Sequence, residues 1–230
     1  MVQKQTGFTL IEIAIVLVII GLLLGGVLKG QELITSARVR NLISQQDGVK
    51  AAFFGFQDRF RAFPGDYTGA TANIPAISTA ACNGGNGDGD GRIESGDEAR
   101  LAWEHMSKAG FIAGSYICAA ADSATTTPVN PYGLYLQVIY DGTYGGGSSP
   151  QRHNIKTGPQ IPVELISEMD RKVDDGNPNT GGFQFSTFAA QGTAPTGGST
   201  TAPACTSATT ATGIWNATNG STNCGGASLL

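Results

Sequence analysis

Side chains that could bind a metal ion are concentrated in a glycine-rich stretch near the middle of the chain. Asn86, Asp88 and Asp90 alternate with glycines, and Gly91 follows at the point where a tight loop must turn sharply. Calcium binds about six to eight oxygen atoms, whereas zinc prefers histidine and thiolate ligands, which this stretch lacks. The spacing of these three side chains therefore predicts a calcium-binding loop.

The second half of the loop continues the ligand spacing of an EF-hand calcium loop and then departs from it. Arg92 stands where a backbone carbonyl is a ligand, and Glu94 stands where a side chain reaches the ion through water. The EF-hand pattern ends in a bidentate glutamate, but Asp97 occupies that position here and Glu98 comes one residue later. We expect residues 86–98 to hold a structural Ca²⁺. The alternative is a Gly-Asp-rich surface loop that binds no ion.

A second acidic turn covers residues 173–181. It contains Asp174 and Asp175, followed by asparagines and a glycine. Residues of these types cap helices, form turns or bind a cation. The EF-hand spacing is absent, so turn formation is the preferred interpretation and cation binding is the alternative.

One more acidic side chain stands out because its surroundings are apolar. From Phe8 to Leu28 only Thr9 and Glu12 are polar. A helix of this length spans roughly 30 Å, which is the hydrocarbon core of one bilayer. A glutamate in such a helix costs roughly 3 kcal/mol unless it has a partner. An ordinary signal peptide is the alternative, but no small-residue cleavage site follows the apolar stretch.

The residues from Gly7 to Glu12 (Gly-Phe-Thr-Leu-Ile-Glu) resemble the processing and methylation site of the type IV pilins and type II secretion pseudopilins. The resemblance implies that a prepilin peptidase cleaves after Gly7 and that the new amino group of Phe8 is methylated. It also implies that Glu12 neutralises the Phe8 ammonium of a neighbouring subunit in a filament. Opposite charges attract strongly in an apolar bundle, and an unpaired charge there is costly.

The same resemblance implies the partners and the location of the protein. The partners are further copies of the chain in a helical filament, the prepilin peptidase, and the inner-membrane machinery that assembles pili or secretes proteins. The precursor is expected in the inner membrane with a single span. The mature protein is then expected in an extracellular filament or in a periplasmic pseudopilus.

The helix that begins at Phe8 is predicted to continue beyond the membrane. Apolar side chains from Leu33 to Phe56 recur with approximately helical spacing, and charged residues occupy the other faces. The sequence from Phe63 to Asp66 contains Pro-Gly, a strong stop signal. We therefore expect one helix over residues 8–62, with an apolar first half and an amphipathic second half.

The remaining elements predict an α+β, pilin-like fold. Helices are expected at residues 98–110 and 163–171, and strands at 132–140, 183–188 and 214–216. The long helix would pack on a small antiparallel sheet, with a loop-rich, disulfide-stapled C-terminal region. The expected organisation is a cleaved leader (1–7), a transmembrane or filament-core half-helix (8–28), an amphipathic half-helix (29–62) and a globular head (63–230).

Four glycines lie where the two halves of the long helix meet: Gly21, Gly25, Gly26 and Gly30. Many type IV pilins resemble this segment but carry a proline at the position of Leu28, where the helix unwinds on assembly. This chain lacks that proline. Two interpretations stay open: unwinding at glycines, each of which weakens a helix by about 1 kcal/mol, or close helix packing in the membrane.

The four cysteines fit an oxidising compartment and allow three pairings. Cys205 and Cys224 bracket a Ser/Thr/Asn-rich stretch that a local disulfide would organise. That pairing leaves Cys82 with Cys118. Bridges in these places resemble the stapled C-terminal loop of many pilins, and the other pairings remain open.

Composition and motifs favour a protein without catalytic activity. The net charge is −4 and charged residues make up 14% of the chain, so bulk charge does not indicate nucleic-acid binding. His105 and His153 are far apart in sequence, and neither a nucleophile elbow nor a phosphate-binding loop is present.

Three functions therefore remain. The first is a structural subunit of a type IV pilus-like filament. The second is a pseudopilin or minor pilin of a type II secretion system. The third is a membrane-anchored calcium-binding module that does not polymerise. Glu12 argues against the third, because a lone anchor gains nothing from an acid in its apolar segment.

Overall fold

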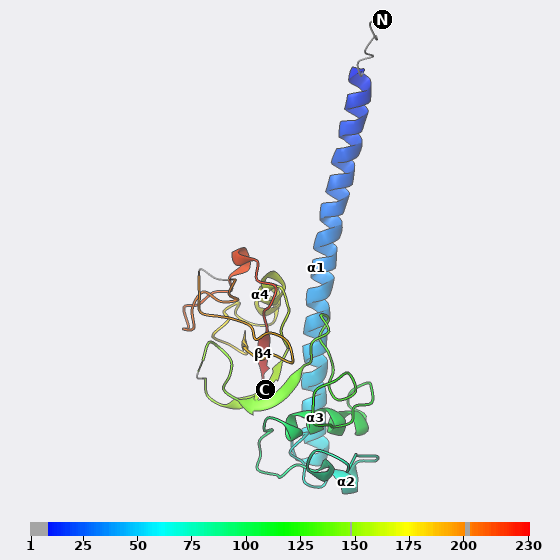
Figure 1. Ribbon diagram of the computed structural model, residues 1–230, viewed down its shortest axis with the longest axis vertical. Helices are drawn as coiled ribbons and strands as arrows, with labels where there is room; N and C mark the ends of the chain where they lie inside the picture. Colours follow the sequence, from blue (N-terminus) through cyan, green and yellow to red (C-terminus); the bar gives the residue numbers. More distant parts are fainter. Residues whose placement is uncertain (1–8, 148, 201–202) are drawn as a thin grey trace, which may run out of the picture. The chain divides into compact units, whose positions relative to one another are not determined.

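The computed structural model describes residues 9–147, 149–200 and 203–230. The chain divides into two compact units, residues 1–38 and 39–230. Both units contain part of the long helix α1 (Leu10–Phe60). The second unit is the head, an α+β arrangement of helices, a small sheet and many loops (Figure 1).

Helix α1 ends two residues before the predicted boundary. Arg61, the next residue, adopts a positive φ of 55°, and its N–H still bonds to the carbonyl of Gln57. Pro64 follows shortly afterwards and cannot continue the helical hydrogen bonds. The helix is unbroken at Gly25 and Gly26, so the glycines alone do not unwind it in the single chain.

The second half of α1 forms one wall of the head. Its buried side chains recur every three or four residues, as the predicted amphipathic pattern requires. Phe53 and Phe56 pack with Trp103 in one hydrophobic cluster, and Leu42 packs with Ile166 in another. The full set of buried α1 residues is Val39, Leu42, Gln46, Val49, Ala52, Phe53 and Phe56.

The sheet has four antiparallel strands in the order β1-β2-β4-β3. Their bounds are Gln137–Asp141 for β1, Arg152–Lys156 for β2, Phe183–Phe185 for β3 and Gly226–Leu229 for β4. In Figure 1, α4 and β4 lie in the same part of the head as the C-terminus. Strand β1 overlaps the predicted strand 132–140 and extends one residue beyond it, and β3 falls within the predicted strand 183–188.

Two strands were not predicted, and one predicted strand was wrong. Ile214, Trp215 and Asn216 contribute only an isolated bridge between Trp215 and Thr206. Strand β4 begins with a glycine, because a Cβ on Gly226 would lie 2.2 Å from the ring of Phe183. Strand β2 is mostly polar in sequence, and pairing with β1 and β4 makes it a strand.

The helices of the head are short. They are α2 (Ala70–Asn73), α3 (Asp97–Lys108) and α4 (Val163–Val173), with 3₁₀ turns η1 at Asn83–Gly85 and η2 at Ala217–Asn219. Helices α3 and α4 match the two predicted head helices to within two residues at each end. Asp97 and Glu98 lie in the first turn of α3, where negative charge is favourable.

Two disulfides link the loops of the head. Cys82–Cys118 joins the segment before the glycine-rich acidic loop to the segment after α3, and Cys205–Cys224 closes a C-terminal loop. These are the two pairs favoured above.

Candidate functional site

Glu12 caps the start of its own helix. Its Oε2 accepts hydrogen bonds from the N–H of Thr9 at 2.8 Å and from the Thr9 hydroxyl at 2.7 Å. The Glu12 N–H donates in turn to Thr9 Oγ1 at 3.4 Å. This reciprocal arrangement is a capping box, which satisfies backbone donors that the first helical turn leaves free. Gly7 and Phe8, the predicted processing residues, lie outside the described residues.

The helix beyond Glu12 presents apolar side chains on every face. The large apolar residues from Leu10 to Leu28 are all at least 45% exposed in the single chain. Within the described part of the chain, α1 is the one helix long and apolar enough to cross a membrane. Such a surface is stable only when lipid or other apolar helices cover it.

In the head, three carboxylates converge on the glycine-rich loop. One carboxylate oxygen from each of Asp66, Asp88 and Asp90 lies within 4.8 Å of the other two. Asp88 and Asp90 are exposed members of the predicted loop. Asp66 comes from the stop signal after α1 and was not among the predicted ligands.

Asp66 is the anchor around which the loop folds. Its side chain is buried, Oδ1 accepts the N–H of Gly89 at 2.7 Å, and Oδ2 accepts the N–H of Gly91 at 3.1 Å. Both glycines have positive φ angles, which lets the loop direct successive amides inward. Gly87 passes so close that a Cβ there would lie 2.3 Å from the Asp66 backbone.

The side chains of Asp88 and Asp90 also organise the loop locally. Asp88 Oδ1 accepts the N–H of Asp90, and Asp90 Oδ1 accepts the N–H of Arg92. Glu94 is exposed, and its backbone N–H donates to the Glu98 carboxylate at 3.0 Å. These bonds keep the loop compact around the three converging carboxylates.

The remaining predicted ligands have other hydrogen-bond partners. Asn86 Oδ1 accepts the N–H of Thr71 at 3.0 Å, and Asp97 pairs with Arg100 at 3.0 Å. Glu98 is buried beneath the loop, where its Oε1 accepts the N–H of Asp88 at 3.2 Å. The guanidinium of Arg92 lies over the ring of Tyr140, at 5.5 Å from its centroid.

The electrostatics of the loop favour a cation. Burial raises the pKa of Asp66, and the charges of Asp90 and Asp88 raise it further, although the amides of Gly89 and Gly91 lower it. Burial likewise raises the pKa of Glu98, with contributions from Asp88 and Asp66. A bound cation would relieve this mutual repulsion, because it favours the charged form of each carboxyl group.

His105 connects the two chain segments that form the site. Its Nδ1 accepts the N–H of Gly65 at 3.0 Å, so Nε2 carries the proton and donates to the carbonyl of Gly85 at 3.1 Å. The side chain is fully buried, and burial lowers its pKa to about 4. The neutral imidazole thus holds Gly65, which precedes Asp66, and Gly85, which precedes Asn86. This role is positional rather than catalytic.

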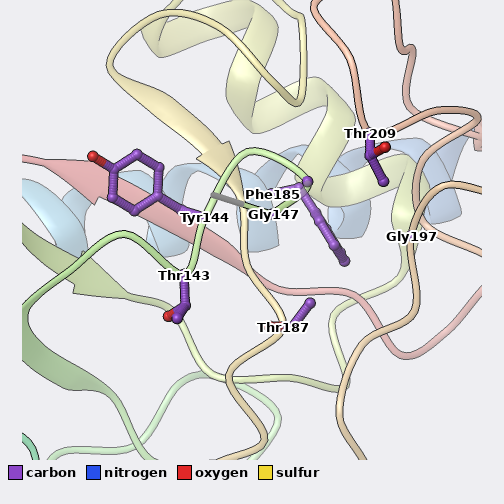
Figure 2. Close-up of a pocket in the computed structure, with 8 residues that line it drawn as sticks. Thr143, Tyr144, Gly147, Phe185, Thr187, Gly197 and Thr209 are labelled. Carbon is purple, nitrogen blue, oxygen red and sulfur yellow. The ribbon is translucent and has the colours of Figure 1, made fainter. Parts of the chain in front are cut away.

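A shallow pocket of about 190 Å³ lies elsewhere in the head, and Figure 2 shows the side chains that line it. They come from the segment after β1, from the end of β3 and from the C-terminal loop. Its described lining has no carboxylate, amine, imidazole or thiol, so it lacks a set of catalytic or metal-binding groups. The lining residues are Thr143, Tyr144, Gly146, Gly147, Phe185, Thr187, Gly197 and Thr209.

Comparison with known proteins identifies the N-terminal segment. Residues 2–28 match the prokaryotic N-terminal methylation motif. No curated protein and no solved structure matches the chain. The match covers the residues around the Thr9–Glu12 capping box and the apolar helix that follows it. The chain therefore carries the N-terminal methylation motif that is the signature of the type IV pilins and pseudopilins.

Proposed function

We propose that this protein is a structural, non-enzymatic subunit of an extracellular type IV pilus-like filament. In this proposal, a prepilin peptidase cleaves the precursor after Gly7, the amino group of Phe8 is methylated, and the mature chain assembles through its N-terminal helix. The precursor waits in the inner membrane. Calcium in the loop at Asp66, Asp88 and Asp90 stabilises the head.

The observation that carries the proposal is a carboxylate at the start of the apolar first half of α1, the segment that bears the methylation motif. The apolar side chains need a cover of lipid before assembly and a cover of neighbouring helices afterwards. Burying one large apolar side chain contributes about 1.5–3 kcal/mol. Exposing the many apolar residues between Leu10 and Leu28 to water would therefore be very costly, so neighbouring helices must replace the lipid when the chain leaves the membrane.

A charge pair at Glu12 would fix the position of each helix along its neighbour. Among the described residues no lysine or arginine pairs with it, and both hydrogen bonds from Thr9 reach the same oxygen, Oε2. The second oxygen is left for a partner from another chain. An ammonium at Phe8 of a neighbouring subunit supplies a positive charge at the same depth of the bundle, where the low dielectric makes the attraction strong.

The chemistry of the head loop supports calcium as its ion. Asp66, Asp88 and Asp90 offer only oxygen atoms, which suit a hard cation. These residues would hold the ion, which would neutralise their charges and tie residues 88–90 to the end of α1. Backbone carbonyls and water would complete the coordination shell.

The loop-rich head favours an exposed filament subunit over a pseudopilin or minor pilin. Electron cryo-microscopy of filaments sheared from cells, together with mass spectrometry of the subunit's amino terminus, tests the proposal. We expect filaments built mainly of this chain and starting at methylated Phe8. Processed chain present only in traces among other subunits would instead establish the pseudopilin or minor-pilin role. An unprocessed chain would overturn both and leave the membrane-anchored module.

A further inference from the structure

Glu104 on α3 is a fully buried carboxylate that belongs neither to the glycine-rich loop nor to the N-terminal helix. Its Oε1 accepts the N–H of Ser78 at 2.7 Å, and its Oε2 accepts the N–H of Cys118 at 2.7 Å. Burying a carboxylate is costly unless hydrogen bonds replace the lost water, and here two backbone donors do so. One side chain therefore joins two segments that are far apart in sequence, and each segment contains one cysteine of the same disulfide.

The first of these segments is held by α3 on both sides of Cys82. Ser78 precedes the cysteine and is bonded to Glu104. Gly85 follows it, and its carbonyl accepts the Nε2–H of His105, also on α3, at 3.1 Å. The φ of Cys82 is 51°, which is uncommon for a residue other than glycine. The bonds on either side oppose relaxation of this turn.

The second segment is held by the same helix. Ser107 Oγ accepts the N–H of Tyr116 at 3.2 Å, and the Ser107 hydroxyl donates to the carbonyl of Gly114 at 2.8 Å. The bond from the Cys118 N–H to Glu104 adds a third contact. These contacts fix the position of the chain at the second cysteine and just before it.

The two cysteines of this disulfide meet against one apolar side chain of α3. Leu101 is fully buried and forms a small hydrophobic cluster with Cys82 and Cys118. Leu101 lies three residues before Glu104, so one face of the helix supplies both the apolar contact and the two hydrogen bonds of the carboxylate. None of these hydrogen bonds uses a sulfur atom, so they do not require a closed disulfide.

We propose that Glu104 selects the Cys82–Cys118 pairing by docking both cysteine segments on α3 before the disulfide forms. Four cysteines allow three pairings. Chain length discriminates weakly between them, because the entropy of loop closure grows slowly with separation. Positioning two reacting groups raises their effective concentration by orders of magnitude. This inference depends neither on calcium nor on the filament function.

The oxidant in this step is a second disulfide, and oxidised glutathione supplies it in the test. The thiolate of one cysteine attacks a sulfur of glutathione disulfide, forms a mixed disulfide and releases one glutathione thiolate. The thiolate of the other cysteine then attacks the mixed disulfide, closes Cys82–Cys118 and releases the second glutathione thiolate. Two protein thiols are oxidised, one glutathione disulfide is reduced, and the released thiolates take up the two protons. Glu104 exchanges no electrons and acts as a positioning residue for the second attack.

The two disulfides of the head provide an internal comparison. We would reduce and unfold the full chain, return it to detergent micelles with oxidised and reduced glutathione, and stop samples by alkylation. Mass spectrometry of peptides then gives the rates at which Cys82–Cys118, Cys205–Cys224 and mispaired species form. The measured quantity is the ratio of the first rate to the second, because general effects on refolding change both.

Glu104→Gln is the test variant, and Asp170→Asn is its matched control. A carboxamide keeps the shape of the side chain but has one acceptor oxygen, so one of the two backbone N–H groups loses its partner. Asp170 is another fully buried carboxylate, and it accepts the indole N–H of Trp215 in the loop closed by Cys205–Cys224. The control therefore perturbs a buried acid next to the other disulfide.

The two variants should behave differently. Glu104→Gln should lower the ratio of the two rates by about tenfold or more and should increase the share of mispaired chains, because the effective concentration of the two thiols falls. Asp170→Asn should not lower that ratio. The proposal is overturned if Glu104→Gln leaves the ratio unchanged, or if Asp170→Asn lowers it equally.

A second measurement keeps Glu104 and removes the disulfide, so it remains decisive if Glu104→Gln does not fold. In a chain with Cys82→Ser and Cys118→Ser, the backbone amides at positions 78 and 118 should stay protected from hydrogen exchange, within about tenfold of the wild type, because Glu104 still accepts them. Loss of protection at both positions would show that the disulfide holds the segments on α3, and that Glu104 does not position them beforehand.

Discussion

Thr9 and Glu12 form a capping box at the first turn of α1, with the Glu12 carboxylate accepting both the backbone and the hydroxyl hydrogen of Thr9. In the single chain this arrangement explains how an acid is accommodated in the first turn of the apolar half of α1. A capping box does not need a charge, however, because glutamine can replace glutamate in it. The charge of Glu12 is therefore available for a separate role in assembly.

The first prediction separates the capping hydrogen bonds of Glu12 from its negative charge. Glu12→Gln should preserve the capping box and the apolar helix, so the precursor should still insert, be cleaved after residue 7 and be methylated. Filament formation should fall at least tenfold, because the attraction to the Phe8 ammonium is lost. Immunoblots of sheared filaments and mass spectrometry of the membrane fraction would measure the two effects separately.

Thr9→Ala is the matched control for this experiment. It removes the hydroxyl of the cap but keeps the charge of Glu12, at a cost of about 1 kcal/mol to the first helical turn. We expect near-normal filaments from Thr9→Ala. Equal loss of filaments in both variants would show that the cap, rather than the charge, is what assembly requires.

Calcium in the glycine-rich loop should stabilise the head measurably. At a free concentration about 100 times its Kd, a bound ion contributes about 2.7 kcal/mol. Because a protein of this size shifts its Tm by about 2–4 °C per kcal/mol, a chelator should lower the Tm by about 5–10 °C. Thermal unfolding of the full chain in detergent, with and without chelator, checks this prediction.

Asp90→Asn should reduce the fall in Tm that the chelator causes, since Asp90 is an exposed carboxylate of the proposed calcium site. Asp58→Asn is a suitable control, because Asp58 is an exposed acid near the end of α1 and pairs with the exposed Arg61. Identical chelator responses in wild type and Asp90→Asn would refute calcium binding at this loop.

His105 should make the stability of the head depend on pH. Its pKa is about 4 in the folded protein and 6.5 without burial, so the unfolded chain binds a proton over this interval and the folded chain does not. The free energy of unfolding should have its full value above pH 6.5. It should fall as the pH drops towards 4, and His105 should account for up to about 3 kcal/mol of the loss. Denaturant unfolding at several pH values measures the slope.

His105→Gln removes the titration and retains polar groups between Gly65 and Gly85. The variant should be less stable at neutral pH but should lose less stability than the wild type between pH 6.5 and pH 4. Parallel stability curves for the two proteins would mean that His105 does not titrate differently on folding.

Two neighbouring phenylalanines test the packing of α1 on the head. Phe56 is fully buried beside Trp103, whereas Phe54 is 49% exposed on another face of the helix. Phe56→Ala should lower the free energy of unfolding by about 3–5 kcal/mol, because it leaves a cavity in the main cluster. Phe54→Ala should cost much less. Comparable losses in the two variants would contradict the observed orientation of α1.

The Cys205–Cys224 disulfide should contribute measurably to the stability of the head. Its 19-residue separation corresponds to about 3 kcal/mol of loop-closure entropy, and the loop it closes carries Trp215. Replacing both cysteines with serine should destabilise the head by roughly that amount and increase proteolysis between residues 193 and 223. Limited proteolysis with mass spectrometry would detect unchanged cleavage if the loop were held by other contacts.

The sequence by itself determined the features that depend on local pattern. The apolar run, the motif around Glu12 and the amphipathic second half of α1 are each contained in one continuous segment, and so are helices α3 and α4. Their periodicity and end signals are readable without knowledge of distant contacts. The α+β class followed from the same elements.

Only the tertiary structure decided which distant residues meet. Asp66 joins Asp88 and Asp90 because His105 and the loop amides bring the end of α1 to the loop, and no local spacing indicates this. Strand β4 has too few large side chains to be recognised, and it forms because β2 and β3 pair with it. The buried carboxylate of Asp170 on α4 likewise depends on Trp215, which lies 45 residues further along the chain and donates its indole N–H to it. Contacts of this kind depend on how the chain packs, so a local sequence pattern does not predict them.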